Sequence, residues 1–210
     1  MAAAALAALV VIAPSGVRAE ANARGMELFQ LCAQCHGPEG AGNQLALAPA
    51  IAGLADWYIK AQLHNFKGGT RGTHPEDTGG LRMYPMAQTF KTDADIDALA
   101  AYVAALPPAR PAPVLTGGDP ARGAQYYQVC LACHGPDATG NQAIGSPRLT
   151  GQADWYLLSS LQKLKGGIRG TYPTAVIMRG MASTLPDEQA MKDVIAHIMT
   201  LSSQTAAIAK

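Results

Sequence analysis

The sequence has few aromatic side chains, little net charge and no long apolar run beyond its first residues. Phe, Trp and Tyr make up 6% of the 210 residues, against 22 glycines and 14 prolines. This mix is lean for a large side-chain core and favours a buried cofactor. The net charge of +1 argues against nucleic-acid binding. Beyond residue 19, no segment reaches the roughly 18 apolar residues that a membrane-spanning helix needs.

The first 19 residues are predicted to be a signal peptide. Residues 2–12 are apolar but too few to span a bilayer, and Val17-Arg18-Ala19 places small residues at the −3 and −1 positions of a cleavage site. No Lys or Arg precedes the apolar run, which indicates a start codon assigned too far downstream or a truncated sequence. An ordinary buried helix is the alternative. A cleaved signal peptide predicts a periplasmic protein.

From residue 20 onward the chain is one unit written twice. Matching residues stand 98 positions apart over about fifty positions, and 95 positions apart after Thr73. The first copy therefore has three extra residues in the loop from His74 to Gly80. The matched segments include Arg24-Gly25 and Arg122-Gly123, Gly42-Asn43-Gln44 and Gly140-Asn141-Gln142, Ala55-Asp56-Trp57-Tyr58 and Ala153-Asp154-Trp155-Tyr156, and Lys67-Gly68-Gly69 and Lys165-Gly166-Gly167.

A proline-rich segment, residues 107–113, joins the two copies. Prolines at this density form an extended, semi-rigid spacer without a helix. We therefore expect one domain over residues 20–106, a linker over 107–113 and a second domain over 114–210.

Each copy has the pattern of helices and loops, without the alternation of a strand. Asp56 and Asp154 are predicted to cap the second helix of each copy, and a first helix is expected over residues 21–31. The other predicted helix starts are Thr92 or Asp93, Asp119-Pro120 and Pro186-Asp187. The apolar faces of the last helices are Ile96, Leu99, Ala100 and Val103, then Met191, Val194, Ile195 and Ile198. The expected fold is all-α.

The motif C-x-x-C-H occurs once in each copy, at Cys32, Cys35 and His36 and at Cys130, Cys133 and His134. It is the attachment signature of c-type haem. Two thiols one helical turn apart can add to the two vinyl groups on one edge of the porphyrin, and the next residue then places its imidazole under the iron. The pattern predicts two covalently bound haem c groups, with iron bound by His36 and His134.

Three other interpretations of the cysteines are weaker. A thioredoxin-like pair requires a strand–helix context, which is absent. A zinc site requires four ligands together, but the two pairs stand 98 positions apart. Two structural disulfides would leave the adjacent histidines unexplained.

Methionine is the expected second ligand of each iron, because its thioether favours ferrous iron and raises the potential. Two methionines match in each copy, in what we expect to be loops before the last helix: Met83 and Met86, then Met178 and Met181. In c-type domains the ligand commonly stands seven residues before an apolar residue that precedes the last helix. Met83 before Phe90 and Met178 before Leu185 keep this spacing, so Met83 and Met178 are favoured. Core methionines are the alternative.

Other matched residues are candidates for the surroundings of the haem. Pro49 and Pro147 follow the haem histidines by 13 positions, and a proline carbonyl there can accept the His Nδ1–H bond. Aromatic residues near the haem edges and arginines near the propionates are also expected. These are Trp57, Tyr58, Trp155, Tyr156, Arg71 and Arg169. A turn proline, ordinary packing and solvated charge are the alternatives.

Taken together, the duplicated C-x-x-C-H, G-N-Q, P-x-(I/L)-x-G before a Trp-Tyr helix, K-G-G and M-x-x-M-A resemble the cytochrome c4 family over essentially the whole mature chain. The resemblance implies two tandem class I cytochrome c domains related by a pseudo-twofold, with the haem propionates facing each other across their interface. It also implies His/Met ligation at both irons and electron delivery to a terminal oxidase.

Two hypotheses for function follow. The first is a free electron carrier, not an enzyme, that passes single electrons from a quinol-oxidising complex to a terminal oxidase. The second is a haem-bearing subunit of a dehydrogenase, such as a sulfide dehydrogenase, or of an oxidase complex. A peroxidase would require one iron without methionine, whereas both copies have a candidate.

Overall fold

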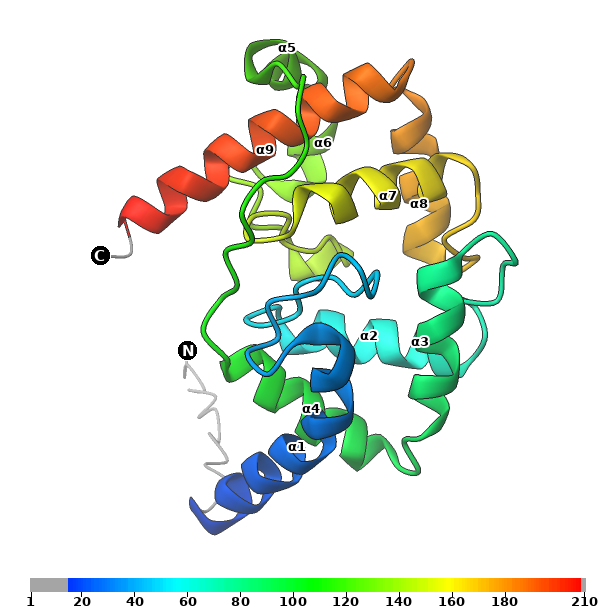
Figure 1. Cartoon of the computed structure of the whole chain (residues 1–210), viewed down its shortest axis with the longest axis vertical. Helices are drawn as coiled ribbons and strands as arrows, with labels where there is room; N and C mark the ends of the chain where they lie inside the picture. The colour runs from blue at the N-terminus through cyan, green and yellow to red at the C-terminus, as the bar shows by residue number, and fades with distance from the viewer. Residues whose placement is uncertain (1–14, 209–210) are drawn as a thin grey trace, which may run out of the picture.

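The computed structural model describes residues 15–208, and over this range the protein is all-α, as expected (Figure 1). Between these residues the extended pairing is limited to two isolated bridges, Asn43 with Ala48 and Asn141 with Ser146, at matching positions of the two copies. The helices are α1 (Ser15–His36), α2 (Asp56–Lys67), α3 (Thr78–Gln88), α4 (Asp93–Ala105), α5 (Pro120–Tyr126), α6 (Gln128–His134), η1 (Gln142–Ile144), α7 (Asp154–Lys165), α8 (Pro173–Ser183) and α9 (Glu188–Ile208).

The second copy lies above the first in Figure 1, and each is built around a crossing of its first and last helices. α1 packs on α4, and α5 packs on α9. Glycine stands at both crossings. A Cβ on Gly25 would lie 2.3 Å from the Ala98 carbonyl oxygen, and one on Gly123 would lie 1.9 Å from that of Asp193. The repeated Arg-Gly dipeptide is thus explained by the close approach of two helix backbones.

Two apolar cores lie beneath these crossings. The predicted inward faces of the last helices are buried as expected, and each core also holds a buried aromatic residue, Phe29 of α1 in the first copy and Tyr127, between α5 and α6, in the second. Phe29 packs beside Tyr102 in the first copy, and Tyr127 packs beside His197 in the second, with ring centroids 5.4 and 5.2 Å apart. The residues of the two inward faces are Ile96, Leu99, Ala100 and Val103, and Met191, Val194, Ile195 and Ile198.

The methionine segments are helical, so the expectation of loops was wrong. Met83 and Met86 lie in α3, and Met178 and Met181 lie in α8. Glycines and Pro85 argued against a helix. The Asp77 side chain, however, accepts a hydrogen bond from Gly80 N and so caps α3, and α8 has a proline in its first turn, where the missing N–H has no cost.

Several helix ends differ from those expected. α1 extends well beyond residues 21–31, because the haem motif continues its last turns, whereas the matching stretch of the second copy is divided at Tyr127 into α5 and α6. Of the predicted signal peptide, residues 1–14 lie outside the described part of the chain. The caps at Asp119 and Thr92 are present, and Asp187 accepts from Ala190 N at the start of α9.

Asp56 and Asp154 are the first residues of α2 and α7, and not their caps. The N-cap positions are Ala55 and Ala153, which make no side-chain hydrogen bond. The buried Asp154 carboxylate has a different task. Its Oδ2 accepts from both Val114 N and Leu115 N at 2.7 Å, and so fixes the chain that follows the linker.

The connection between the copies is extended and lies against the first one. Residues 107–113 contain no helix. The buried Ala109 packs against Ala50 and Ala52, and its N–H donates to the Ala52 carbonyl. The connection is therefore held near both of its ends.

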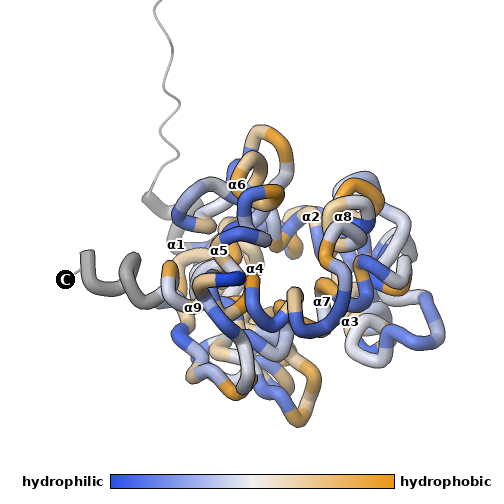
Figure 2. Tube along the Cα trace, turned by 90° about the horizontal axis from the view of Figure 1, so that it is seen from above, coloured by the Kyte–Doolittle hydropathy of each residue, from blue (hydrophilic) through white to orange (hydrophobic). Residues whose placement is uncertain are grey.

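Along the described chain, hydrophobic and hydrophilic residues alternate in short stretches (Figure 2). None of the helices described is long and apolar enough to cross a membrane.

Candidate haem-binding site

Each C-x-x-C-H motif lies on the last turn of a helix, α1 in the first copy and α6 in the second. The helical spacing places the two cysteines of a motif one turn apart, as attachment to one porphyrin edge requires. None of the four cysteines is part of a disulfide. Burial raises the pKa of Cys32 and of Cys130 to about 11, which keeps both thiols protonated at neutral pH. These are not the low-pKa thiolates of a redox pair.

Both motif histidines are buried and hydrogen-bonded in the same way. His36 Nδ1 lies 2.8 Å from the Pro49 carbonyl oxygen, and His134 Nδ1 lies 2.8 Å from that of Pro147. A carbonyl only accepts, so Nδ1 carries the proton and Nε2 keeps a lone pair for a metal. Burial also lowers the pKa of both histidines, against the opposing effect of the proline carbonyls, and so favours the neutral ligand. In the second copy Ser146 Oγ also lies 3.2 Å from Nδ1.

The proline loops are held by a repeated glycine. Gly42 N donates to the His36 carbonyl at 2.8 Å, and Gly140 N donates to that of His134 at 2.9 Å. Gly42 has a φ of +92°, and a Cβ there would lie 2.7 Å from Ala50 N. Glycine is therefore required, and it fixes the proline carbonyl relative to the imidazole.

One continuous cavity with a volume of about 350 Å³ extends through both copies. His36 and Met83 line it in the first copy, and His134 and Met178 in the second. Met181 also lines the cavity, with 37% of its surface exposed, whereas Met86 does not line it. The structure thus brings the favoured methionine and the histidine of each copy to the same space.

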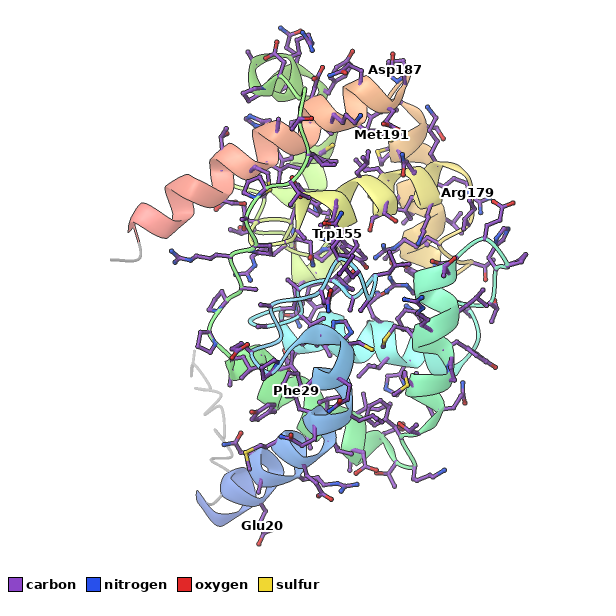
Figure 3. All side chains as sticks on the ribbon, in the orientation of Figure 1. Glu20, Phe29, Trp155, Arg179, Asp187 and Met191 are labelled. Carbon is purple, nitrogen blue, oxygen red and sulfur yellow. The ribbon has the colours of Figure 1, made fainter. Side chains whose placement is uncertain are left out.

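Other predicted residues reach this cavity unequally. Both prolines, both tyrosines and both arginines of the predicted set line it. Trp155 lines it too and lies where the two copies meet (Figure 3), but Trp57 does not, although each tryptophan packs edge-on against the tyrosine that follows it. Of the four cysteines, Cys130 and Cys133 line the cavity, while Cys32 packs against the first core.

Arg71 and Arg169 each donate a hydrogen bond to a tyrosine of the other copy. Arg71 Nη2 donates to Tyr156 OH of the second copy at 3.0 Å, and Arg169 Nη2 donates to Tyr58 OH of the first at 3.4 Å. Each also donates through Nη1 to its own copy, Arg71 to Gln62 and Arg169 to Ser160. The sequence repeat is therefore matched in space by pairs of equivalent hydrogen bonds.

Both guanidinium groups are buried, and within residues 15–208 no carboxylate accepts a hydrogen bond from either of them. Arg71 is 8% exposed and Arg169 is 7% exposed, and the groups that accept from them are one amide and several hydroxyls. Their charge is felt by Tyr156: burial raises its pKa, but Arg169 and Arg71 outweigh that effect and lower it to about 7. Buried charges are normally paired with charges of opposite sign, so this part of the cavity suits a ligand that carries carboxylates.

The residues present fit haem c in three respects. Each histidine keeps one nitrogen for iron, the shared cavity is bordered by apolar side chains such as Ile59, Leu63 and Leu157, and the two buried arginines require carboxylates, which haem propionates supply. When bound, haem c provides an iron that gains and loses one electron. The chain's task is to attach it, to hold the imidazoles and to exclude water.

The interface contains further contacts that the sequence did not suggest. Gln152 of the second copy pairs with the backbone of Ala50, and Arg148 Nη2 donates to the Gly53 carbonyl at 3.0 Å. Lys163 Nζ lies 2.8 Å from Asp77 Oδ1 of the first copy. Asp77 lies in the loop that is longer in the first copy, and that length difference was the one available signal.

The cytochrome c family model matches residues 22–107 and 120–202. Cytochrome c4 of Azotobacter vinelandii is 33% identical over 175 residues, which cover 79% of this chain and 82% of that protein. The chain belongs to the cytochrome c4 family. The structure of reduced recombinant cytochrome c4 from Pseudomonas stutzeri aligns with it at a TM-score of 0.67 and 27% identity, over 84% of this chain and 96% of that chain. The thiosulfate dehydrogenase electron acceptor of Thiomonas intermedia (strain K12) is 33% identical over 170 residues, or 75% of this chain and 73% of that protein.

Membership of the cytochrome c4 family accounts for the duplicated site. The protein is a dihaem electron carrier with two cytochrome c domains, and it carries two covalently attached haem c groups, one on each C-x-x-C motif.

Proposed function

We propose that this cytochrome carries single electrons in the periplasm, from a quinol-oxidising complex to a terminal oxidase, with iron bound by His36 and Met83 in one domain and by His134 and Met178 in the other. The observation that carries the proposal is the equivalence of the two ends of the cavity. Each end has a neutral imidazole fixed by a proline carbonyl and a methionine lining the same space.

Two protein ligands at each iron leave no coordination position for a substrate. Iron in that state exchanges electrons, whereas gas or peroxide chemistry requires an open position. Methionine also stabilises the ferrous state, which suits an acceptor late in a respiratory chain. We prefer Met83 and Met178 as the ligands, because Met86 does not line the cavity and Met181 is more exposed.

The proposal includes the processing and division of the chain. Residues 1–19 would direct export to the periplasm and would then be removed. Residues 20–106 and 114–210 would be two domains joined by 107–113. N-terminal sequencing of the protein from a periplasmic extract tests the first point and should begin at Glu20.

Reduction and reoxidation by the named partners test the function itself. A membrane fraction with quinol-oxidising activity should reduce both haems, and oxidase-containing membranes should reoxidise them, each step being abolished by the inhibitor of its complex. Failure of the oxidase to reoxidise the reduced protein would contradict the proposed direction.

The second candidate function is that of a haem-bearing subunit of a dehydrogenase or oxidase complex. The likeness to a thiosulfate dehydrogenase electron acceptor favours a dehydrogenase as the donor. Gel filtration of the native periplasmic extract separates the cases, because a free carrier elutes near the mass of a single chain and a subunit elutes with its partner.

A further inference from the structure

The two buried arginines match in position but differ at one nitrogen. Arg169 uses all three of its guanidinium nitrogens: Nη1 and Nη2 donate as described above, and Nε donates to Tyr172 OH at 3.2 Å. Arg71 makes the matching Nη1 and Nη2 bonds, but its Nε has no partner. Within residues 15–208, Arg71 Nε is the buried side-chain nitrogen left without a hydrogen bond.

The cause of the difference is the residue before each methionine helix. Tyr172 is the N-cap of α8, and Asp77 is the N-cap of α3, so the two residues hold matching positions. Tyr172 OH accepts a hydrogen bond from Arg169 Nε. The Asp77 carboxylate instead accepts from Gly80 N and binds Lys163 of the other domain at 2.8 Å. Asp77 is therefore engaged elsewhere, and Arg71 Nε stays free.

We propose that Arg71 Nε–H is an open donor for a haem carboxylate, and that Tyr172 is a positioning residue that withholds the same donor of Arg169, so that the two haem sites are electrostatically unequal. This inference rests on the proposed function of the cavity as a dihaem site. Its support is a guanidinium that is 8% exposed, lines the cavity and has a nitrogen without a partner.

The inequality acts on the redox equilibrium through charge. A carboxylate near iron favours the ferric state, because it stabilises the extra positive charge. A carboxylate that accepts a bond from a guanidinium does so less, since charge-assisted hydrogen bonds are strong and neutralise it locally. The haem served by Arg71 is therefore easier to reduce than it would be with Arg71 Nε occupied, and the haem served by Arg169 would become easier to reduce if Arg169 Nε were freed.

Tyr172→Phe is the decisive variant, because it keeps the buried ring and removes only the acceptor of Arg169 Nε–H. Optical redox titration of the holoprotein should show that one of the two midpoint potentials rises and the other is unchanged. Arg71→Lys keeps the charge but replaces the whole guanidinium, Nε included, with one ammonium group, and it should lower the other potential. Arg169→Lys should lower its own potential by less than Arg71→Lys does.

Tyr126→Phe is the matched control, since it removes a phenol from the same domain on α5, and both potentials should stay in place. If Tyr172→Phe leaves both potentials unchanged or lowers one, the positioning role of Tyr172 is overturned. Equal shifts in the two arginine variants would overturn the inequality. Mass spectrometry counts the covalent haems of the unmodified protein and of each variant. Fewer than two haems on the unmodified protein would contradict the proposed function. Unchanged potentials in a variant that carries both haems would contradict only this inference.

Discussion

Gln152 of the second domain pairs with both backbone groups of Ala50 in the first. Its Oε1 accepts from Ala50 N at 3.1 Å, and its Nε2 donates to the Ala50 carbonyl at 2.9 Å. Ala50 is buried and follows Pro49, whose carbonyl binds His36. One amide side chain thus connects the second domain to the loop that orients the imidazole of the first.

Gln152→Ala should weaken the interface and the first domain together. The change leaves two buried backbone groups of Ala50 unpaired, each at a cost of about 1–3 kcal/mol. Denaturant unfolding should show a lower free energy of unfolding and an earlier transition for the first domain. Gln142→Ala, at an exposed position of η1, is the control and should change the stability by less than about 0.5 kcal/mol. Equal effects of the two changes would contradict the role given to Gln152.

Lys163→Gln should destabilise the protein by about 3 kcal/mol, because it leaves the Asp77 carboxylate, 5% exposed, without its cation. The loss should be measurable by thermal or chemical unfolding. Lys192→Gln removes a lysine from an exposed i,i+4 pair with Glu188 and should cost only about 0–1 kcal/mol. If the two lysines prove equivalent, Asp77 does not depend on Lys163.

Asp193→Asn should reduce stability at neutral pH but not at low pH. The Arg122 guanidinium outweighs the effect of burial and lowers the pKa of Asp193 from its usual 3.8 to about 2. A depressed carboxyl pKa stabilises the fold above the unfolded-state value, and that stability is lost as the pH falls through the folded-state value. We expect a deficit of about 1–2 kcal/mol at pH 7, because Arg122 is half exposed and solvent screens the pair.

The deficit of Asp193→Asn should close between pH 3.8 and about 2, as followed by urea unfolding at several pH values. The control is Asp97→Asn, whose carboxylate is 60% exposed and pairs with Lys60, and its effect should be small at every pH. A deficit that is independent of pH would show that charge is not the reason for the loss.

Gly42→Ala should disturb the first haem site through its proline loop. At a φ of +92° and with Ala50 N only 2.7 Å from the added Cβ, the substitution should cost about 1–3 kcal/mol. Gly180→Ala is the matched control within α8: its Cβ would meet no atom within 4 Å, and it should be neutral or stabilise by up to about 1 kcal/mol. Unfolding curves of the two variants decide the point, and an unaltered Gly42→Ala protein would contradict the packing argument.

Met83→His should lower one midpoint potential and leave the other nearly unchanged, because imidazole favours ferric iron more than a thioether does. The weak long-wavelength band of methionine-bound ferric haem should lose about half of its intensity, since one of the two proposed sites changes. Met86→His should have neither effect. The opposite result, a shift for Met86→His alone, would reverse the assignment within this pair.

The haem motifs and their histidines could be located from the sequence because the chemistry there depends on short spacing. Cys32, Cys35 and His36 occupy one helical turn, and the duplication repeats it. The buried faces of α4 and α9 could likewise be predicted, since helical periodicity specifies which side chains are inward.

The helix that holds Met83 could not be predicted, because local propensity pointed the other way. Gly79, Gly80 and Pro85 disfavour a helix, and the Asp77 cap outweighs them only in the folded chain. The interface was also beyond prediction. Its pairs, such as Arg71 with Tyr156, join residues far apart in the sequence, and they depend on how one domain lies on the other.

The buried carboxylate of Asp154 also bears on the rate at which electrons pass between the two domains. It fastens the chain at Val114 and Leu115 to the second domain, while Ala109 is fastened to the first, so the connection has little slack with which to act as a hinge. An electron exchanged between the two sites would then move within a single body and would not wait for tethered domains to meet by diffusion. Such exchange should proceed at one rate, insensitive to solvent viscosity.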